Sequence, residues 1–332
     1  KKFNNGSIHI DIEKKFGRIF SEDKIRHYSG KIHNIISCVK NSKGIILIYS
    51  QYINNGCIPI ALALEELGLK RYNGNNLFET PPKNNYKINE KGDIGKYVMI
   101  TGDVKLSPNN KMELKACTSK NNINGENVKV IIISRTGTEG LDFKNIRQIH
   151  IMEPWYNMNR IDQTIGRGIR NISHCNLKYE ERNVEIYLYA SRPPNNIKDD
   201  VEPADLYMYR LAEKKGIKIG KVRRLLKETA IDCLLNENQM KFTEEKMNKS
   251  VIQVTSTGKN IDTFFLGDKN NSIICDFTNC DYECAFKPNY ELKDNLNTTT
   301  YNENMIVTNL EKILKRIKLL FKEKYIYEKN DL

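Results

Sequence analysis

The sequence contains no apolar run near the ~20 residues that span a bilayer. It also has no charged segment followed by an apolar core near its start, as a secretory signal has. Both absences favour a cytoplasmic setting and predict no membrane partner. No internal repeat is present. The first residue is Lys1 rather than Met, so we expect the chain to be a piece of a longer protein.

Acidic residues are fewer than basic ones. The 332 residues include 41 Asp and Glu against 53 Lys and Arg, for a net charge of +12. This excess favours polyanionic partners, because each neutralised phosphate releases counterions. An even spread of charge from a Lys-rich composition is the alternative. The length and the 39% hydrophobic content fit a globular protein with two domains, or one large domain with an extension.

Short apolar runs alternate with helical patterns between residues 44 and 191. The expected strands are 44–49, 69–72, 97–101, 128–134, 147–152 and 184–189, and the expected helices include 29–40, 58–67 and 107–117. This alternation predicts an α/β fold with a mainly parallel, doubly wound sheet.

The part of the chain that follows this region in sequence is predicted to be mostly helical. Residues 196–237 and 306–327 have helical apolar spacing, with short strands expected at 251–255 and 262–266. We therefore expect three parts: a helical lead-in or linker at 1–43, the α/β domain at 44–195, and a C-terminal extension at 196–332.

Small polar residues follow three of the expected strands. They are Ser50 after the first strand, Thr101 and Gly102 after another, and Ser134 and Arg135 after a third. Ligands of doubly wound sheets bind beyond the carboxyl ends of the strands, and hydroxyl and backbone N–H groups can hold phosphates. Together these ends predict contacts with a nucleic-acid backbone. For each end alone, an ordinary turn is the alternative.

The stretch from Lys129 to Arg170 is predicted to form strand, glycine turn, strand and helix. In the turn, Gly140 would let the backbone approach a ligand closely. Asp142 could accept hydrogen bonds from a ribose hydroxyl, and a helix-capping aspartate is the alternative. We expect the stretch to meet a nucleotide and a phosphate backbone from one side.

Gln163, Arg167 and Arg170 are spaced i, i+4, i+7, which places them on one helical face. Gly166 would let that helix approach another surface closely. Two arginines one turn apart suit a γ-phosphoryl group in transfer, because guanidinium groups stabilise its developing charge. A solvated basic helix face is the alternative.

Cysteines cluster near the C-terminal end at Cys275, Cys280 and Cys284. Structural zinc is usually held by four ligands. The five histidines lie far away in sequence, so Cys233 is the best candidate for the fourth ligand. The cluster predicts structural Zn²⁺, and buried free thiols are the alternative.

These motifs resemble those of a known family. QTIGRGIR at 163–170 resembles QxxGRxxR, the last signature motif of superfamily-two helicases, and SRTGTEGLD at 134–142 resembles the preceding one. Residues 44–50 resemble the motif that opens the second RecA-like domain. Over roughly 25–330, the chain resembles helicases of large nucleocytoplasmic DNA viruses, of the poxvirus early transcription factor small subunit and mimivirus-like type.

The resemblance implies the C-terminal half of an ATP-dependent helicase or translocase. Arg167 and Arg170 would be arginine fingers that reach the ATP phosphates, and Gln163 would help position the nucleotide or couple it to the motor. Gly140 and Asp142 would contact its ribose. The strand ends would hold the phosphates of the tracked strand.

The implied cofactor is ATP with Mg²⁺, and the implied partners are DNA or RNA and a viral RNA polymerase. The implied location is the cytoplasmic virus factory or the virion.

The sequence departs from the full helicase pattern. It contains no GxxxxGK(S/T) motif and no DExx tetrad after an apolar strand, and Lys111 stands where related proteins often have Arg. We therefore expect the P-loop RecA-like domain to lie elsewhere, in the same or another chain, and this chain alone to be inactive.

Two alternatives remain. One is a non-catalytic module with a helicase-like fold that binds nucleic acid or polymerase. The other is a nucleotide-independent adaptor built on residues 196–330.

Overall fold

The structure is a computed structural model of the chain. It describes residues 2–4, 7–9, 16–78, 80, 82, 85–88, 92–135, 141–178, 181–192, 202–237, 240–254, 259–286, 303–324 and 326–328. The chain divides into two compact units, Lys1–Cys284 and Ala285–Leu332. The domain boundaries expected at 43/44 and 195/196 stay predictions.

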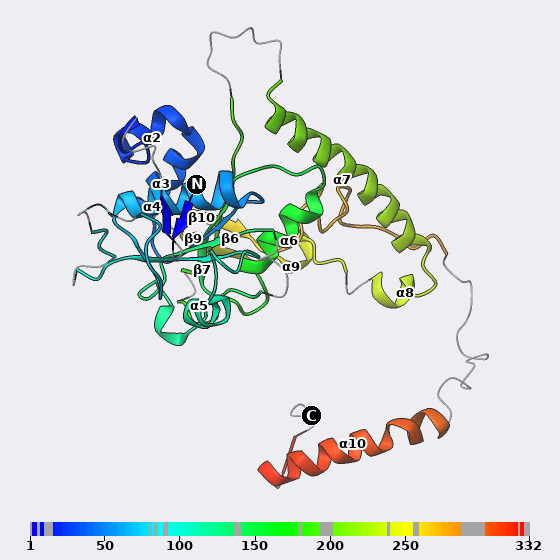
Figure 1. The fold of residues 1–332 in the computed structure, drawn as a ribbon. Helices are drawn as coiled ribbons and strands as arrows, with labels where there is room; N and C mark the ends of the chain where they lie inside the picture. The colour runs from blue at the N-terminus through cyan, green and yellow to red at the C-terminus, as the bar shows by residue number, and fades with distance from the viewer. Residues whose placement is uncertain are drawn as a thin grey trace. The chain divides into compact units, whose positions relative to one another are not determined.

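A six-stranded sheet forms the centre of the first unit (Figure 1). Its strands, in spatial order, are β4 (Lys70–Arg71), β5 (Lys96–Ile100), β6 (Val130–Ile133), β3 (Ile45–Tyr49), β7 (Ile146–Ile151) and β8 (Glu185–Leu188). All five neighbouring pairs are parallel. The predicted parallel α/β architecture is therefore confirmed.

Helices cover both faces of the sheet. On one face, Ile46 and Ile48 of β3 share a core with α3 (Gly30–Asn41) and α4 (Ile58–Leu67). On the other face, Leu47 shares a core with residues of α5 (Asn110–Cys117) and α6 (Met158–Gly168). Alternate residues of a strand point to opposite faces. Covering both faces explains why β3 and β6 are uninterrupted apolar runs.

Local signals set the ends of these helices. The Ser29 hydroxyl accepts a hydrogen bond from the Ile32 N–H and caps α3. Gly68 ends α4 with φ 103°, a left-handed conformation that glycine adopts without strain. A π-helical turn, η1 (Ile53–Cys57), precedes α4 and was not predicted. Smaller elements before and between the strands are α2 (Glu22–Tyr28) and η2 (Lys120–Asn122).

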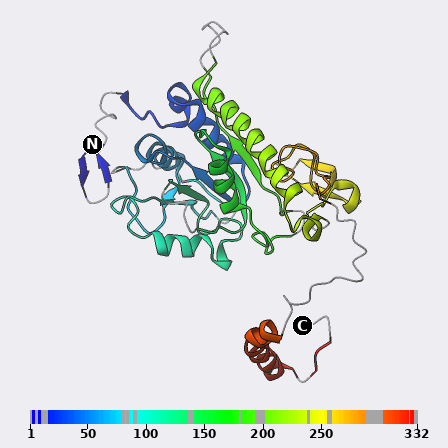
Figure 2. The same cartoon turned by 90° about the vertical axis from the view of Figure 1, so that its right-hand side faces the viewer.

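The helix α7 (Ala204–Thr229) lies against α6 (Figure 2). Asp205 near its start forms an ion pair with Lys31 of α3, at 2.7 Å. The Tyr209 hydroxyl donates to the carbonyl oxygen of Tyr189, just after β8, at 3.3 Å. These contacts fasten the C-terminal part of the first unit to the sheet domain.

Short elements follow α7 and complete the first unit. They are α8 (Cys233–Asn236), α9 (Glu244–Met247), and the antiparallel pair β9 (Ser250–Val254) and β10 (Asn260–Phe265). The start of the chain forms a small hairpin of β1 (Lys2–Asn4) and β2 (Ser7–His9). The second unit contains α10 (Glu303–Glu323), an amphipathic helix in the region where one was predicted. None of the described helices is long and apolar enough to cross a membrane.

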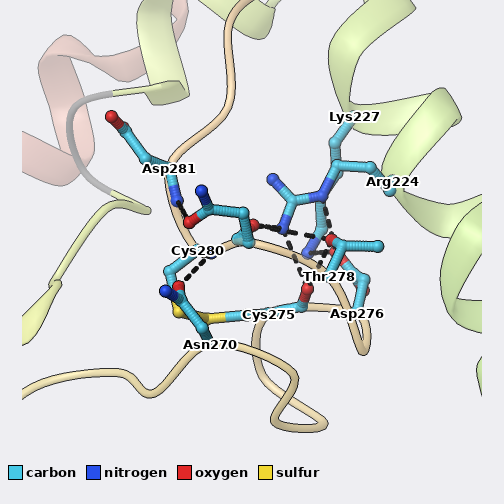
Figure 3. The surroundings of a disulfide bond; sticks show 9 residues. Arg224, Lys227, Asn270, Cys275, Asp276, Thr278, Cys280 and Asp281 are labelled. Carbon is cyan, nitrogen blue, oxygen red and sulfur yellow. Dashed lines mark hydrogen bonds and ion pairs between the residues drawn. A yellow bond between two sulfur atoms is a disulfide. The ribbon is translucent and has the colours of Figure 1, made fainter.

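The four clustered cysteines form two disulfides, Cys233–Cys284 and Cys275–Cys280. Figure 3 shows the second of them. A sulfur atom bonded to another sulfur is not available as a thiolate ligand. Among the described residues, no group of three or more His, Cys, Asp or Glu is placed to hold a metal. The structure thus corrects the zinc prediction. Cys233 is joined to the cluster by a disulfide with Cys284, not by a shared metal ion.

Basic residues of α7 hold the loop that contains the second disulfide (Figure 3). The Arg224 guanidinium donates to the carbonyl oxygens of Cys275 at 2.9 Å and Asn279 at 2.7 Å. Lys227 pairs with Asp276, whose side chain is 1% exposed, at 2.5 Å. A Cβ at Gly220 would overlap the Asp276 carbonyl group, so this close approach requires glycine.

Two glycines of α7 give a matched test of this packing. At Gly216, an added Cβ would meet Phe277 at ordinary contact distance, 3.4 Å. Gly216→Ala should therefore raise the unfolding free energy by up to about 1 kcal/mol, the helix-propensity gain. Gly220→Ala should lower it by about 1–3 kcal/mol through steric overlap. Denaturant unfolding followed by circular dichroism measures both. Equal stability of the two variants would mean that the loop does not lie against α7.

The disulfides predict a specific thiol count. Cys38, Cys57, Cys117 and Cys175 are free. Alkylation of denatured, unreduced protein should therefore label four of the eight cysteines, and all eight after reduction. Mass spectrometry gives the counts, and metal analysis of the same sample should find no bound zinc. Eight labelled thiols without reduction, together with one equivalent of zinc, would restore the metal site.

Candidate functional site

The predicted nucleic-acid contacts lie together at the carboxyl edge of the sheet. The strands β5, β6 and β3 are neighbours, so the residues that follow them are adjacent. The Ser134 N–H donates to the Ile100 carbonyl oxygen at 3.2 Å, and the Ser50 N–H donates to that of Ile133 at 3.1 Å. Thr101, Ser134 and Ser50 therefore form a row across three strand ends.

The hydroxyl groups at this edge are engaged inside the protein. The Ser50 side chain is buried and donates to a Glu153 carboxylate oxygen at 2.8 Å. The Thr101 hydroxyl is also buried and lies 2.9 Å from the Ser107 hydroxyl. These two side chains hold turns in place. Gly102 and Arg135, by contrast, are exposed at the same edge.

Glu153 is a residue of this edge that the sequence analysis missed. It follows β7, and its carboxylate also accepts the backbone N–H of Gln51 at 3.1 Å. Burial raises the pKa of Glu153, and the hydrogen bonds from Ser50 and Gln51 partly oppose that shift. An acidic residue just beyond a buried strand was the signal that could have identified it. Its carboxylate ties the turn after β3 to the turn after β7.

The arginine group lies at the opposite end of β7. The Phe143 N–H donates to the Arg167 carbonyl oxygen, and the Asn145 N–H to that of Ser173, both at 3.0 Å. These bonds place the chain that enters β7 beside the end of α6. Because α6 runs back along the sheet from the carboxyl edge, the expectation of one common binding side is wrong. The structure separates the strand ends from the arginines.

Asp142 lies between the two arginines. Its Oδ1 atom is 2.8 Å from Nη1 of Arg170 and 4.0 Å from Nη1 of Arg167. Arg167 also donates from Nη1 to the Leu141 carbonyl oxygen at 3.3 Å. Asp142 and Arg170 are about half-exposed, whereas the Arg167 side chain is 19% exposed. The Arg167 Nε atom is buried and has no hydrogen-bond partner among the described residues.

Two details of this group differ from expectation. Because α6 ends at Gly168, Arg170 lies beyond the helix, and only Gln163 and Arg167 share its face. A Cβ at Gly168 would lie 2.9 Å from Ile149 of β7, so Gly168 makes the close approach predicted for Gly166.

Gly166 itself has open space around it, with no atom within 4 Å of an added Cβ. Gln163 is exposed on the same helix. The predicted ribose contact Gly140 lies outside the described residues. The open surface at Gln163 and Gly166 thus leaves room for a ligand beside the arginine group.

Residues 30–171 match the family model described as "Helicase conserved C-terminal domain". This segment is therefore similar to a helicase C-terminal domain. It contains α3, the strand ends and the whole group formed by Asp142, Arg167 and Arg170.

Viral proteins are among the relatives. The chain is 28% identical over 265 residues to a protein named as helicase 087L of Invertebrate iridescent virus 3, covering 79% of this chain and 24% of that protein. It is 26% identical over 370 residues to one named as ATP-dependent RNA helicase L377 of Acanthamoeba polyphaga mimivirus, covering 95% and 30%.

A third relative is the "Termination factor NPH-I homolog" of African swine fever virus, 32% identical over 238 residues, covering 63% of this chain and 33% of that protein. The predicted resemblance to viral helicases is confirmed. The chain spans about a quarter to a third of the length of these relatives.

The internal hydrogen bond of Ser50 generates a prediction. Ser50→Ala should lower the unfolding free energy by about 1–3 kcal/mol, because Glu153 loses a buried donor. Ser37→Ala is the control, since that hydroxyl bonds only the His33 carbonyl oxygen of its own helix and its loss should change stability by less than about 0.5 kcal/mol. Urea unfolding compares the two. Unchanged stability with weakened nucleic-acid binding would instead give Ser50 the phosphate contact first predicted.

Proposed function

We propose that this chain supplies the second half of the ATP site, and part of the nucleic-acid path, of an ATP-dependent helicase or translocase. The observation that supports this most is the convergence of Arg167 and Arg170 on Asp142, beside the open surface of α6. In this proposal the two arginines act as arginine fingers on the ATP phosphates.

The charges of this group favour an anionic ligand. Two guanidinium groups share one carboxylate, which leaves an excess positive charge. An exposed ion pair contributes only about 0–1 kcal/mol, so phosphate oxygens can replace Asp142 at little cost. Charge-assisted hydrogen bonds to phosphate are stronger than neutral ones, and the unpaired Arg167 Nε offers one more donor. Asp142, once released, can accept a ribose hydroxyl.

The rest of the ATP site must come from another domain. The sequence has no P-loop motif, and a P-loop and its acidic partners normally hold the β- and γ-phosphates and Mg²⁺. We propose that a P-loop RecA-like domain, in the same or another chain, closes against the arginine group. The name of one relative, an ATP-dependent RNA helicase, supports ATP with Mg²⁺ as the cofactor.

The carboxyl edge is the proposed surface for DNA or RNA. Gly102 and Arg135 are exposed there, and the chain has a net charge of +12. The termination-factor name of the African swine fever virus relatives supports a role in viral transcription. A viral RNA polymerase is then the expected protein partner, and the virus factory or the virion the expected location.

A second candidate is a non-catalytic module that binds nucleic acid or polymerase. The missing P-loop motif favours it. In such a module the arginine group has no ATP phosphate to contact, so substitutions there should not change ATPase activity.

Hydrolysis of ATP tests the two candidates. The isolated chain should show no ATPase above background. A protein in which it is joined to its P-loop domain should hydrolyse ATP in the presence of nucleic acid. In that protein, Arg167→Ala or Arg170→Ala should lower kcat by about 10³–10⁵-fold, the usual effect of an arginine finger.

Arg182→Ala is the matched control. That guanidinium donates to the carbonyl oxygens of Leu177 and Cys175, and its loss should leave kcat unchanged. The affinity for nucleic acid should be unchanged by all three substitutions, because the proposed nucleic-acid path lies at the other end of β7. Wild-type turnover by the isolated chain, insensitive to either arginine, would overturn the proposal. ATPase unchanged by both variants in the joined protein would favour the non-catalytic module.

A further inference from the structure

A cavity of about 280 Å³ lies beside the carboxyl ends of β4 and β5, apart from the arginine group. Its walls include Arg71 at the end of β4, Val104 and Lys105 in the turn after β5, and Asn109 and Glu113 at the start of α5. The turn begins directly after Thr101 and Gly102, so the cavity adjoins the proposed nucleic-acid edge.

Glu113 is a buried acid with one carboxylate oxygen that no described residue satisfies. It is 1% exposed, and its Oε2 atom accepts no hydrogen bond from any described residue. Burial raises the pKa of Glu113, and the positive charge of Arg71 partly opposes this shift. A buried polar group without a partner is unfavourable. Its place in the cavity wall is explained if a ligand supplies the missing donors.

Arg71 supplies the complementary donor. Its Nη2 atom donates to the Leu106 carbonyl oxygen, and its backbone N–H donates to the Asn76 side chain at 3.1 Å. Gly74 also packs closely, since an added Cβ would lie 3.3 Å from the Arg71 side chain. The Arg71 Nε atom is nevertheless buried and unpaired among the described residues. The cavity therefore combines an unused acceptor with an unused, fixed donor.

We propose that this cavity binds a guanine base of the nucleic-acid strand. Guanine presents two adjacent N–H donors on one edge, which match the carboxylate of Glu113. It presents acceptors O6 and N7 on the other, which are the usual partners of arginine. Adenine and cytosine each lack the pair of adjacent N–H donors. The exposed Lys105 at the cavity is suited to a flanking phosphate.

The size of the cavity agrees with a single base. At about 280 Å³ the cavity is at the small end of ligand pockets, which usually measure roughly 300–1,000 Å³, so the sugar and phosphate would lie outside it. Single-stranded nucleic acid is commonly recognised through unstacked bases inserted into protein pockets. The inference rests on the proposed nucleic-acid path at the carboxyl edge, and adds a preference for one base to that path.

Matched single strands test the preference. The full chain is titrated with oligothymidylate that contains one guanine, one hypoxanthine or one adenine at the same position. Because the backbones are identical, differences in affinity report the base alone. The guanine strand should bind about tenfold tighter than the other two. Hypoxanthine lacks only the 2-amino group of guanine, so the comparison with it tests that donor alone. Glu113→Gln should abolish the difference, whereas Glu126→Gln, an exposed glutamate after α5, should preserve it.

A second probe separates this inference from the proposed function. Guanosine monophosphate, followed by protein NMR, should shift resonances around Arg71 and Glu113, and adenosine monophosphate should not. Strands that bind equally tightly whatever the base, with no response to guanosine monophosphate, would overturn the guanine site and leave the nucleic-acid path intact. A specific response to guanosine monophosphate without any strand binding would keep the site and overturn the path.

Discussion

The contact between α6 and β7 sets the geometry of the candidate ATP site. Gly168 lets the end of α6 approach Ile149 so closely that a larger residue would require movement. That approach brings the Arg167 carbonyl oxygen within hydrogen-bond distance of the Phe143 N–H. The bond in turn places Asp142 between the arginines. The positions of these charged groups therefore depend on an apolar contact between a helix and a strand.

The same geometry separates the two proposed binding regions along one strand. A helix that follows a parallel strand runs back across the sheet, so α6 carries Arg167 away from the carboxyl edge where Ser50 lies. A nucleotide at one end of β7 and a nucleic-acid strand at the other would be linked through rigid, buried structure. Glu153, at the carboxyl end of β7, ties the turn after β3 to this strand. Hydrogen bonds of Glu153 therefore join the turn after β3 directly to the carboxyl end of β7.

Much of the fold could be predicted because burial on both faces leaves a strong local signal. The strand expected at 44–49 is β3 at Ile45–Tyr49, and the helix expected at 58–67 is α4 at Ile58–Leu67. Spacing alone could not show that α6 ends before Arg170. The Arg170 N–H donates to the Ser173 hydroxyl, which lies in the turn that follows the helix. Cysteine spacing likewise gives proximity, but not the choice between a metal and covalent pairing.

The buried acids show what a sequence cannot reveal about partners. Glu65 accepts the Tyr97 hydroxyl at 2.6 Å, and Glu66 pairs with Arg18 at 3.0 Å. Each of these carboxylates thus recovers within the protein the hydrogen bonds that burial removes. Glu113 is as buried as Glu65, yet no described residue donates to it. Glu65 and Glu66 lie in α4 and Glu113 lies in α5, and only the tertiary structure shows which of the three carboxylates are paired. In the proposed guanine site, the partner of this carboxylate comes from outside the chain.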